Sequence, residues 1–263
     1  MNTLKESPFL VTLLLFLFVG IVMLLPTKSF LQEVVGDKFK GEYLDLICKM
    51  GVLFIASYYL IQKLDLQLHL GMASDVPWKF KYLNLIPVYL FTLGILSVVS
   101  KDFASVSAVN IILLFVACLF VGFAEELLFR GVIQSLFLKK HGVLFSVLMS
   151  SLSFGLFHLV NLVKNDSVLG QVLVQVVFAY FIGFFFGMLL LKTGKLIPIA
   201  VTHGLINFFF SLQLLPAFNS HQNSSVSIAP IIIFLPLLIS GVFIYRSIPN
   251  NILMEELSRD ING

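Results

Sequence analysis

The sequence predicts an all-α integral membrane protein, a bundle of about eight transmembrane helices. Three observations predict this fold class. Hydrophobic residues make up 59% of the 263 residues and charged residues only 12%, which is too little charge for a water-exposed surface. The mean hydropathy is +1.01. The apolar residues form long continuous runs, whereas the strands of a membrane β-barrel would alternate apolar and polar residues over about ten positions.

The expected helices follow from the length of these runs, because a bilayer core takes about 20 helical residues to cross. Eight runs satisfy this length, and they cover residues 8–26, 43–62, 82–100, 105–138, 142–163, 168–191, 195–215 and 226–245. The loops between the runs are short, so residues 1–263 are predicted to form a single multi-pass membrane domain. The fourth run is too long for one simple crossing and predicts a tilted, protruding or bent helix.

The first run, from Pro8 to Pro26, is predicted to be a retained membrane anchor. It is long for the core of a signal peptide, and no cleavage site of small residues follows it. The second run has Asp45 and Lys49 near its start, four positions apart, so the two side chains can pair on one helix face. In the sixth run, Gln171 and Gln175 share a face and predict hydrogen bonds between helices.

The distribution of Lys and Arg outside the runs predicts the orientation. With the N-terminus in the cytoplasm, the inner segments hold Lys5, Lys63, Lys79, Lys81, Lys139, Lys140, Lys192, Lys195, Arg246 and Arg259. The outer loops then hold Lys28, Lys38, Lys40, Lys101 and Lys164. Ten residues against five favour both termini in the cytoplasm, in a protein of the cell membrane.

Neither the net charge nor the two cysteines point to a functional site. The net charge of +3 is spread along the loops, and no basic cluster with interleaved aromatic residues predicts nucleic-acid binding. Cys48 and Cys118 lie far apart in apolar runs and are expected to be reduced packing residues.

A small group of polar residues lies deep in the apolar runs, where ionisable side chains are costly and tend to be functional. The group is spread over the fourth, fifth and seventh runs and consists of Glu125, Glu126, Arg130, His158, His203 and Asn207. The spacing of Glu126 and Arg130 puts them on one helix face and predicts an ion pair. Glu125 is turned roughly 100° away from Glu126 and is freer to face a cavity.

The expected depth of these residues brings them together. A turn is predicted at 139–142, and Glu125 lies about 16 residues before its centre and His158 about 17 residues after it, so both sit at nearly the same height in an antiparallel hairpin. Counted from a second turn near Gly194, His203 and Asn207 lie about 9 and 13 residues into their helix. They are therefore expected to be shallower, and to come within reach only if the first turn protrudes.

These residue types suit amide hydrolysis, which needs a deprotonated water, a stabilised oxyanion and a protonated leaving amine. Glu125 can act as the general base, His158 can hold the same water, and His203 and Asn207 can face the oxyanion. Alternatively, Glu125, His158 and His203 can ligate zinc, which activates a bound water. Metal-independent catalysis by Glu and His fits the sequence equally well.

Three motifs in this order resemble the CAAX proteases and bacteriocin-processing enzymes, a family that includes the Ras-converting CAAX endopeptidases. The chain has EELLFR at 125–130, FGLFH at 154–158 and HGLIN at 203–207, which match the family's EExxxR, FxxxH and HxxxN patterns. The resemblance implies a membrane protease, often labelled a metalloprotease, with a catalytic core at 105–215.

The resemblance also assigns expected roles. Glu125 is the base and His158 its partner in holding the water, while His203 and Asn207 stabilise the oxyanion or hold a metal. Glu126 belongs to the site, and Arg130 and Phe154 support it.

The predicted function is hydrolysis of a peptide bond in a membrane-associated peptide or protein, either a prenylated CAAX-type or a bacteriocin-like substrate. Membrane lipid is the other expected partner. Two alternatives come from other classes: a non-catalytic membrane scaffold or bacteriocin-immunity protein, and a proton-coupled transporter, since buried Glu and His residues can relay protons. The sequence shows no inverted repeat or paired broken helices of the kind that transporters have.

Overall fold

The computed structural model describes residues 7–66, 85–99, 106–164, 168–212 and 226–248, and every regular element within these ranges is a helix. In chain order the elements are α2 (Pro8–Leu24), α3 (Thr27–Val35), α4 (Lys38–Leu64), α5 (Leu85–Val98), α6 (Ala108–Glu126), the π-helix η3 (Leu127–Gln134), α7 (Ser135–Leu138), α8 (Val143–Phe157), the 3₁₀ turn η4 (His158–Val160), α9 (Asn161–Lys164), α10 (Leu169–Thr193), α11 (Leu196–Leu212) and α12 (Ala229–Arg246). Each of the eight predicted runs corresponds to a helix or to a stack of consecutive helices. The predicted all-helical membrane fold is therefore confirmed.

Six of the helical segments in the described ranges are long and apolar enough to cross a membrane: Pro8–Val35, Lys38–Leu64, Ala108–Leu138, Val143–Val163, Leu169–Thr193 and Ala229–Arg246. The predicted seventh run is a shorter apolar helix, α11. The predicted third run contains α5, which has 14 residues.

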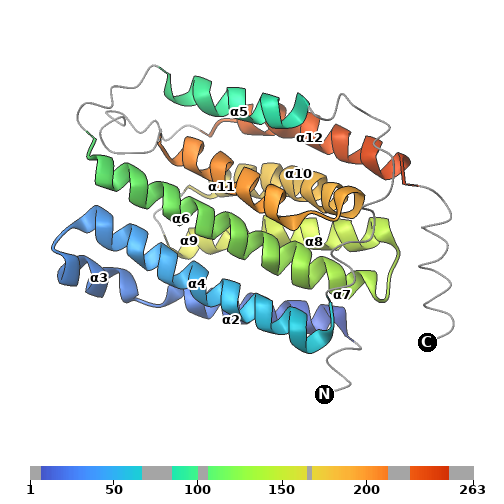
Figure 1. Ribbon diagram of the computed structural model, residues 1–263, viewed down its shortest axis with the longest axis horizontal. Coiled ribbons are helices and arrows are strands. Elements are labelled where there is room, and N and C mark those ends of the chain that lie inside the picture. Colours follow the sequence, from blue (N-terminus) through green and yellow to red (C-terminus); the bar gives the residue numbers. More distant parts are fainter. Residues whose placement is uncertain (1–6, 67–84, 100–105, 165–167, 213–225, 249–263) are drawn as a thin grey trace.

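The helices form one bundle in which α6 and α10 occupy the interior (Figure 1). On one side α6 packs against α4, which in turn packs against α2 and α3, and on the other side α6 packs against α11. Helix α10 packs between α8 and α12, and α5 covers α11. The elements that carry the three motifs, α6, α8 and α11, are thus close to one another inside the bundle.

The turn between α7 and α8 and the turn between α10 and α11 lie at the same end of the bundle, at the right of Figure 1, as does the last turn of α12. The C-terminal end of α4 is tied to this end by Lys139, whose Nζ donates to the carbonyl oxygens of Leu64 and Asp65 at 2.8 and 2.7 Å. These segments are all among those predicted to be cytoplasmic. These segments lie at one end of the bundle, as expected if successive helices cross the membrane in opposite directions. That this end faces the cytoplasm stays a prediction.

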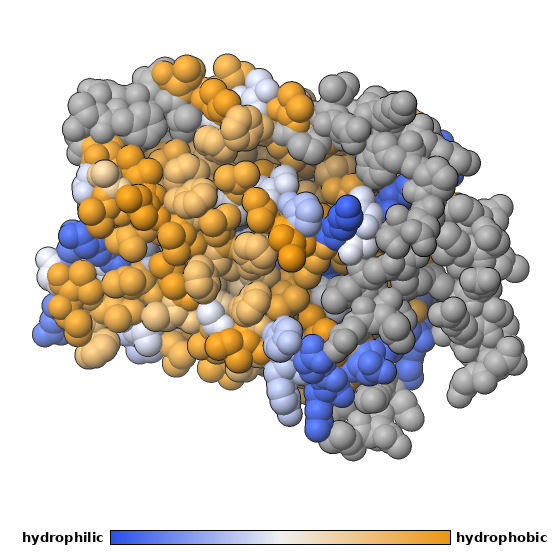
Figure 2. Space-filling model, viewed as in Figure 1, coloured by the Kyte–Doolittle hydropathy of each residue, from blue (hydrophilic) through white to orange (hydrophobic). Residues whose placement is uncertain are grey.

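The surface has the character of a membrane protein. Figure 2 shows an apolar surface over the middle of the described helices, with hydrophilic residues towards the two ends. Large apolar side chains point outwards along these helices, among them Leu13, Ile21 and Ile55 with 57%, 65% and 69% exposure. Both cysteines are free, as predicted. Cys118 is buried, but Cys48 is exposed and does not pack in the core, because it lies on an outward face of α4.

Helix α3 was not predicted, because its residues are mixed in polarity and it lies in what the sequence presents as a loop. It ends at Gly36, whose φ of 67° is readily available to glycine. The predicted pair of Asp45 and Lys49 is present at 2.9 Å, and both side chains are buried. Lys49 also donates to the carbonyl oxygen of Leu25, and the Thr27 hydroxyl donates to Asp45. This polar cluster fixes the corner between α2, α3 and α4.

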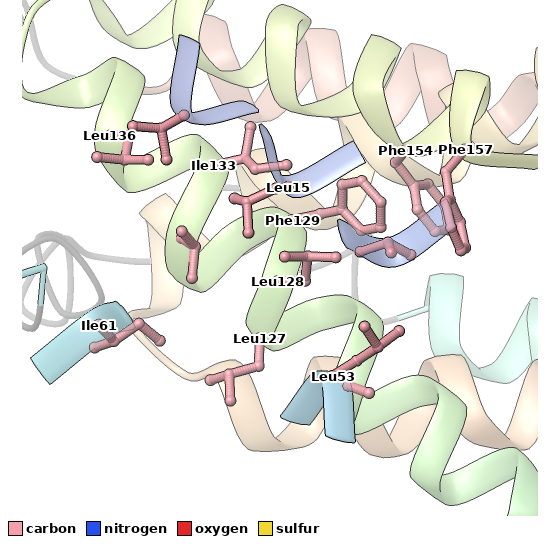
Figure 3. Close-up of a cluster of buried hydrophobic side chains, with 14 of the residues drawn as sticks. Leu15, Leu53, Ile61, Leu127, Leu128, Phe129, Ile133, Leu136, Phe154 and Phe157 are labelled. Atoms are coloured by element: carbon pink, nitrogen blue, oxygen red, sulfur yellow. The ribbon is translucent and has the colours of Figure 1, made fainter. Parts of the chain in front are cut away.

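The long fourth run contains the π-helix η3, which directly follows the two glutamates. Every residue from 124 to 138 is buried, so this part of the chain is surrounded by protein on all sides. Figure 3 shows its side chains in a buried cluster with Phe154 and Phe157 of α8 and with residues of α2 and α4. A π-helix is wider than an α-helix and often occurs at a functional site.

Candidate active site

Two glycines allow α6 and α11 to touch at backbone level. A Cβ placed on Gly122 would lie 2.4 Å from the Ala200 carbonyl oxygen and 2.6 Å from the Gly204 nitrogen. A Cβ on Gly204 would lie 3.0 Å from the Cys118 carbonyl oxygen. Close approach through small residues is the usual way for membrane helices to pack, since lipid provides no hydrophobic drive between them. Gly122 is one turn before the glutamates and Gly204 follows His203, so this contact sets the distance between the first and third motifs.

His203 lies between the two carboxylates. Its Nδ1 is 2.7 Å from Glu126 Oε1, and its Nε2 is 3.5 Å from Glu125 Oε2. Glu126 is fully buried, and Glu125 and His203 are 5% and 4% exposed. An ionised carboxylate only accepts hydrogen bonds, so Glu126 fixes the proton of His203 on Nδ1. The other nitrogen then faces Glu125.

Arg130 completes this buried chain of charges. Its Nε lies 3.0 Å from Glu126 Oε2, which is the ion pair that the spacing predicts, and neither side chain has any exposure. The guanidinium also stacks over the ring of Phe154, 4.6 Å from the ring centroid. None of its three nitrogens, nor Glu126 Oε2, has a hydrogen-bond partner among the described residues, so the contact with Glu126 is an ion pair without hydrogen-bond geometry. Arg130 therefore fixes Glu126 through one face and packs on an aromatic ring with the other.

Phe154 connects all three motifs. Its ring centroid lies 5.3 Å from that of His158 and 5.6 Å from that of His203. Phe129 packs edge-on against it at 5.1 Å. The ring thus contacts both imidazoles.

His158 begins the 3₁₀ turn η4 at the end of α8. Its Nδ1 lies 3.3 Å from Nε2 of Gln175 on α10, and the Gln175 oxygen accepts a 3.0 Å hydrogen bond from Asn161 Nδ2. Gln171, one turn earlier on α10, is exposed. The predicted hydrogen bonding between helices therefore holds for Gln175, and its partner proves to be a motif histidine.

Asn207 lies one turn beyond His203 on α11 and is half-buried. Within the described part of the chain, its side chain makes no hydrogen bond to the other motif residues. His203 reaches the carboxylates although the count from the turns predicts a shallower position. The π-helix explains part of this difference, because it rises less per residue than an α-helix and so brings Glu125 closer to the α7–α8 turn.

The predicted zinc ligands are Glu125, His158 and His203. Among the described residues, no three His, Cys, Asp or Glu side chains are grouped so that they can hold a metal ion. Nδ1 of His203 and Nδ1 of His158 already have partners in Glu126 and Gln175.

The pattern of the sequence did not reveal two parts of this site. The first is the π-helix, whose wide turn is supported by two serines: Ser150 on α8 donates to the Phe129 carbonyl at 2.7 Å, and Ser135 donates to the Arg130 carbonyl at 3.2 Å. The second is the Asn161–Gln175 pair behind His158. Two features of the sequence could have revealed this pair. Gln175 is a polar residue within an apolar run, and Asn161 lies three positions after His158.

The α6–α11 contact leads to a prediction on stability. Gly122→Ala is expected to lower the free energy of unfolding by about 1–3 kcal/mol, because the new methyl meets backbone atoms that cannot move aside. Gly20→Ala on α2 is the matched control, since a Cβ there has nothing within 4 Å. The measurement is unfolding in mixed SDS–detergent micelles. Equal stability of the two variants would mean that α6 and α11 can separate at no cost.

Comparison with known proteins gives one family. A family model described as Type II CAAX prenyl endopeptidase Rce1-like matches residues 107–209. No curated protein and no solved structure shows significant similarity to the chain. The matched segment runs from the start of α6 to within α11 and includes all three motifs. Residues 107–209 therefore support an assignment of this segment to the CAAX protease family.

Proposed function

We propose that the protein is an intramembrane endopeptidase that hydrolyses a peptide bond of a membrane-associated substrate with a water activated by Glu125. One observation carries this proposal: an uninterrupted buried chain runs from Arg130 through Glu126 and His203 to Glu125. A purely structural ion pair needs only the first two of these residues. The additional histidine and carboxylate are arranged as a base with an oriented partner. The family match supports a peptide hydrolase in general.

The proposed chemistry begins with a water held near Glu125 and His158. Glu125 takes a proton from the water as the oxygen attacks the scissile carbonyl carbon, and the carbonyl oxygen becomes an oxyanion. Once Nε2 of His203 shares the proton taken up by Glu125, this nitrogen and the Asn207 amide are the proposed donors to that oxyanion. The C–N bond then breaks as Glu125 returns the proton to the leaving amine.

Glu126 and Arg130 act on this chemistry through His203. Glu126 accepts the Nδ1 proton, so the imidazole is fixed in one orientation and its second nitrogen is directed at the reacting groups. Arg130 pairs with Glu126 where neither side chain is exposed, so the buried carboxylate has a cation beside it. Phe154 packs against both histidines and so limits their movement.

The proposed substrate class rests on the apolar surroundings of α11. A cavity of about 320 Å³ lies between α5 and α11, and Leu90, Phe91, Thr202, Ile206 and Phe209 are among its lining residues. A second cavity of about 150 Å³ shares Leu90 and Thr202 with the first. Thr202 precedes His203, so both cavities border the helix that carries the third motif, although Glu125, His158 and His203 do not line them. An apolar segment of the substrate fits there, either a prenyl chain of a CAAX-type peptide or an apolar stretch of a bacteriocin-like precursor.

Zinc dependence is the alternative within the same activity. Glu125, His158 and His203 would have to change their present hydrogen bonds to become ligands, and bound zinc would supply an activated water. The proposed steps above need no metal.

The test uses purified protein in detergent with a library of quenched peptides, with and without a C-terminal lipid. We expect wild type to cleave, and Glu125→Ala and His158→Ala to lose cleavage. Activity that survives a zinc chelator supports direct catalysis by Glu and His, whereas loss that added zinc restores supports the metal alternative. Cleavage that is unchanged in both variants would identify a contaminant. No cleavage by any form would favour a membrane scaffold.

A further inference from the structure

A partly buried chain of two amide side chains leads to His158 from outside the three motifs. Asn161 Nδ2 donates to Gln175 Oε1 at 3.0 Å, and Gln175 Nε2 lies 3.3 Å from His158 Nδ1. Asn161 and His158 come from the segment that follows α8, and Gln175 comes from α10. All three residues are partly buried.

The backbone brings these residues together in two ways. His158 and Asn161 are separated by the 3₁₀ turn η4, in which residues three apart eclipse each other, so both side chains lie on the same side. Helices α8 and α10 also approach closely, since a Cβ on Gly155 would lie 2.8 Å from the Val176 carbonyl oxygen. The side chain next to that carbonyl, Gln175, is therefore within reach of His158.

The hydrogen-bond roles along this chain follow from the chemistry of the amide. Because the Gln175 oxygen accepts from Asn161, its nitrogen is the group that faces His158. An amide nitrogen can only donate a hydrogen bond. His158 Nδ1 must therefore accept, and in the neutral imidazole the proton is then on Nε2.

His203 has the opposite arrangement. Its Nδ1 is bound by the Glu126 carboxylate, which can only accept, so its proton is on Nδ1. The two imidazoles that contact Phe154 thus present different groups. His158 presents an N–H, and His203 presents the nitrogen that can accept or share a proton with Glu125. Both imidazoles are neutral, but each presents a different nitrogen to the site because its hydrogen-bond partner differs.

We infer that Gln175 is a positioning residue that fixes His158 as a hydrogen-bond donor at Nε2, with Asn161 fixing the orientation of Gln175. This inference rests on the proposed function. His158 then holds the reacting water by its oxygen or stabilises the oxyanion, and proton uptake is left to Glu125 and the nitrogen of His203 beside it.

The test substitutes Gln175 by a residue of the same shape and opposite hydrogen-bonding capacity. In Gln175→Glu, the carboxylate accepts where the amide donated, so it draws a proton to His158 Nδ1. We expect kcat to fall by about 10- to 100-fold, as for other residues that orient an active-site group, with little change in KM. Gln171→Glu on the same helix is the control, because Gln171 is exposed. Equal kcat for Gln175→Glu and wild type would overturn the positioning role.

A spectroscopic measurement separates this role from a structural one. The protein contains five histidines, so ¹⁵N-histidine labelling in detergent gives few signals, and the spectrum of His158→Asn identifies those of His158. Wild type is expected to show the Nε2–H tautomer of His158, and Gln175→Glu to show a protonated Nδ1. A protonated Nδ1 in neutral wild-type His158, or a spectrum unchanged by Gln175→Glu, would contradict the inference. The tautomer is read without substrate, so a wild type that cleaves no peptide would refute the proposed function independently.

Discussion

Replacing Glu125 with Gln is expected to lower kcat for peptide hydrolysis by about 10²–10⁴-fold, the usual contribution of a general base. The amide keeps the shape of the side chain and can still approach His203, but it cannot take a proton from water. Substrate binding is expected to change little, because the carboxylate acts on the water. The measurement is steady-state cleavage of a quenched peptide by the purified variant.

The control for this variant is Glu42→Gln, which removes a carboxylate at the opposite end of the bundle from the α7–α8 turn. Glu42 pairs with Lys28 at 2.8 Å, and its side chain is 45% exposed. We expect wild-type activity from it. If Glu125→Gln retained wild-type kcat, the proton acceptor would have to be another group, and Glu126 and His203 would be the next residues to substitute.

Replacing Arg130 with Met is expected to lower the free energy of unfolding by about 3–5 kcal/mol, because it leaves the buried Glu126 carboxylate without its cation. Met retains much of the apolar volume, so packing on Phe154 is largely kept. Unfolding in mixed SDS–detergent micelles, followed by circular dichroism, measures the change. We also expect activity to fall, because Glu126 no longer fixes His203.

Two further variants test the electrostatic explanation. The double variant Glu126→Gln/Arg130→Met is expected to recover part of the lost stability, since replacing both charges removes the unpaired one. Lys28→Met removes one partner of an exposed pair, for which a change below about 1 kcal/mol is expected. If Arg130→Met and Lys28→Met were equally stable, the burial of the pair would contribute nothing.

The sequence predicted well those features that are determined within a single helix. Run length predicted the helices, and the spacing of Glu126 and Arg130 predicted their ion pair, because both follow from the geometry of a single helix. The contact of His203 with both carboxylates was not predicted, since it depends on how α6 and α11 cross. That crossing is set by Gly122 and Gly204, and the pattern of a run does not reveal which glycines of two helices will meet.

The π-helix and the pairing of Gln175 with His158 and Asn161 were missed for a related reason. A π-helix differs from an α-helix by its backbone hydrogen bonds, and the side chains of residues 127–134 do not show which of the two forms. The carbonyl groups of Phe129 and Arg130 receive serine hydroxyls, one of which comes from α8. Such a partner is visible only when helices that are distant in sequence are placed together.

The burial of residues 124–138 on all sides bears on how this protein enters the membrane during its synthesis. A segment with Glu125, Glu126 and Arg130 at its centre is costly to release alone into lipid, since one Arg at a helix centre costs about 2.5–3.5 kcal/mol on the insertion scale. The apolar residues around these charges make insertion feasible, but their stable position requires α4, α8 and α11 as neighbours. We therefore expect this helix to remain beside the insertion machinery until α11 has been synthesised, so that catalytic competence and completed insertion arise together.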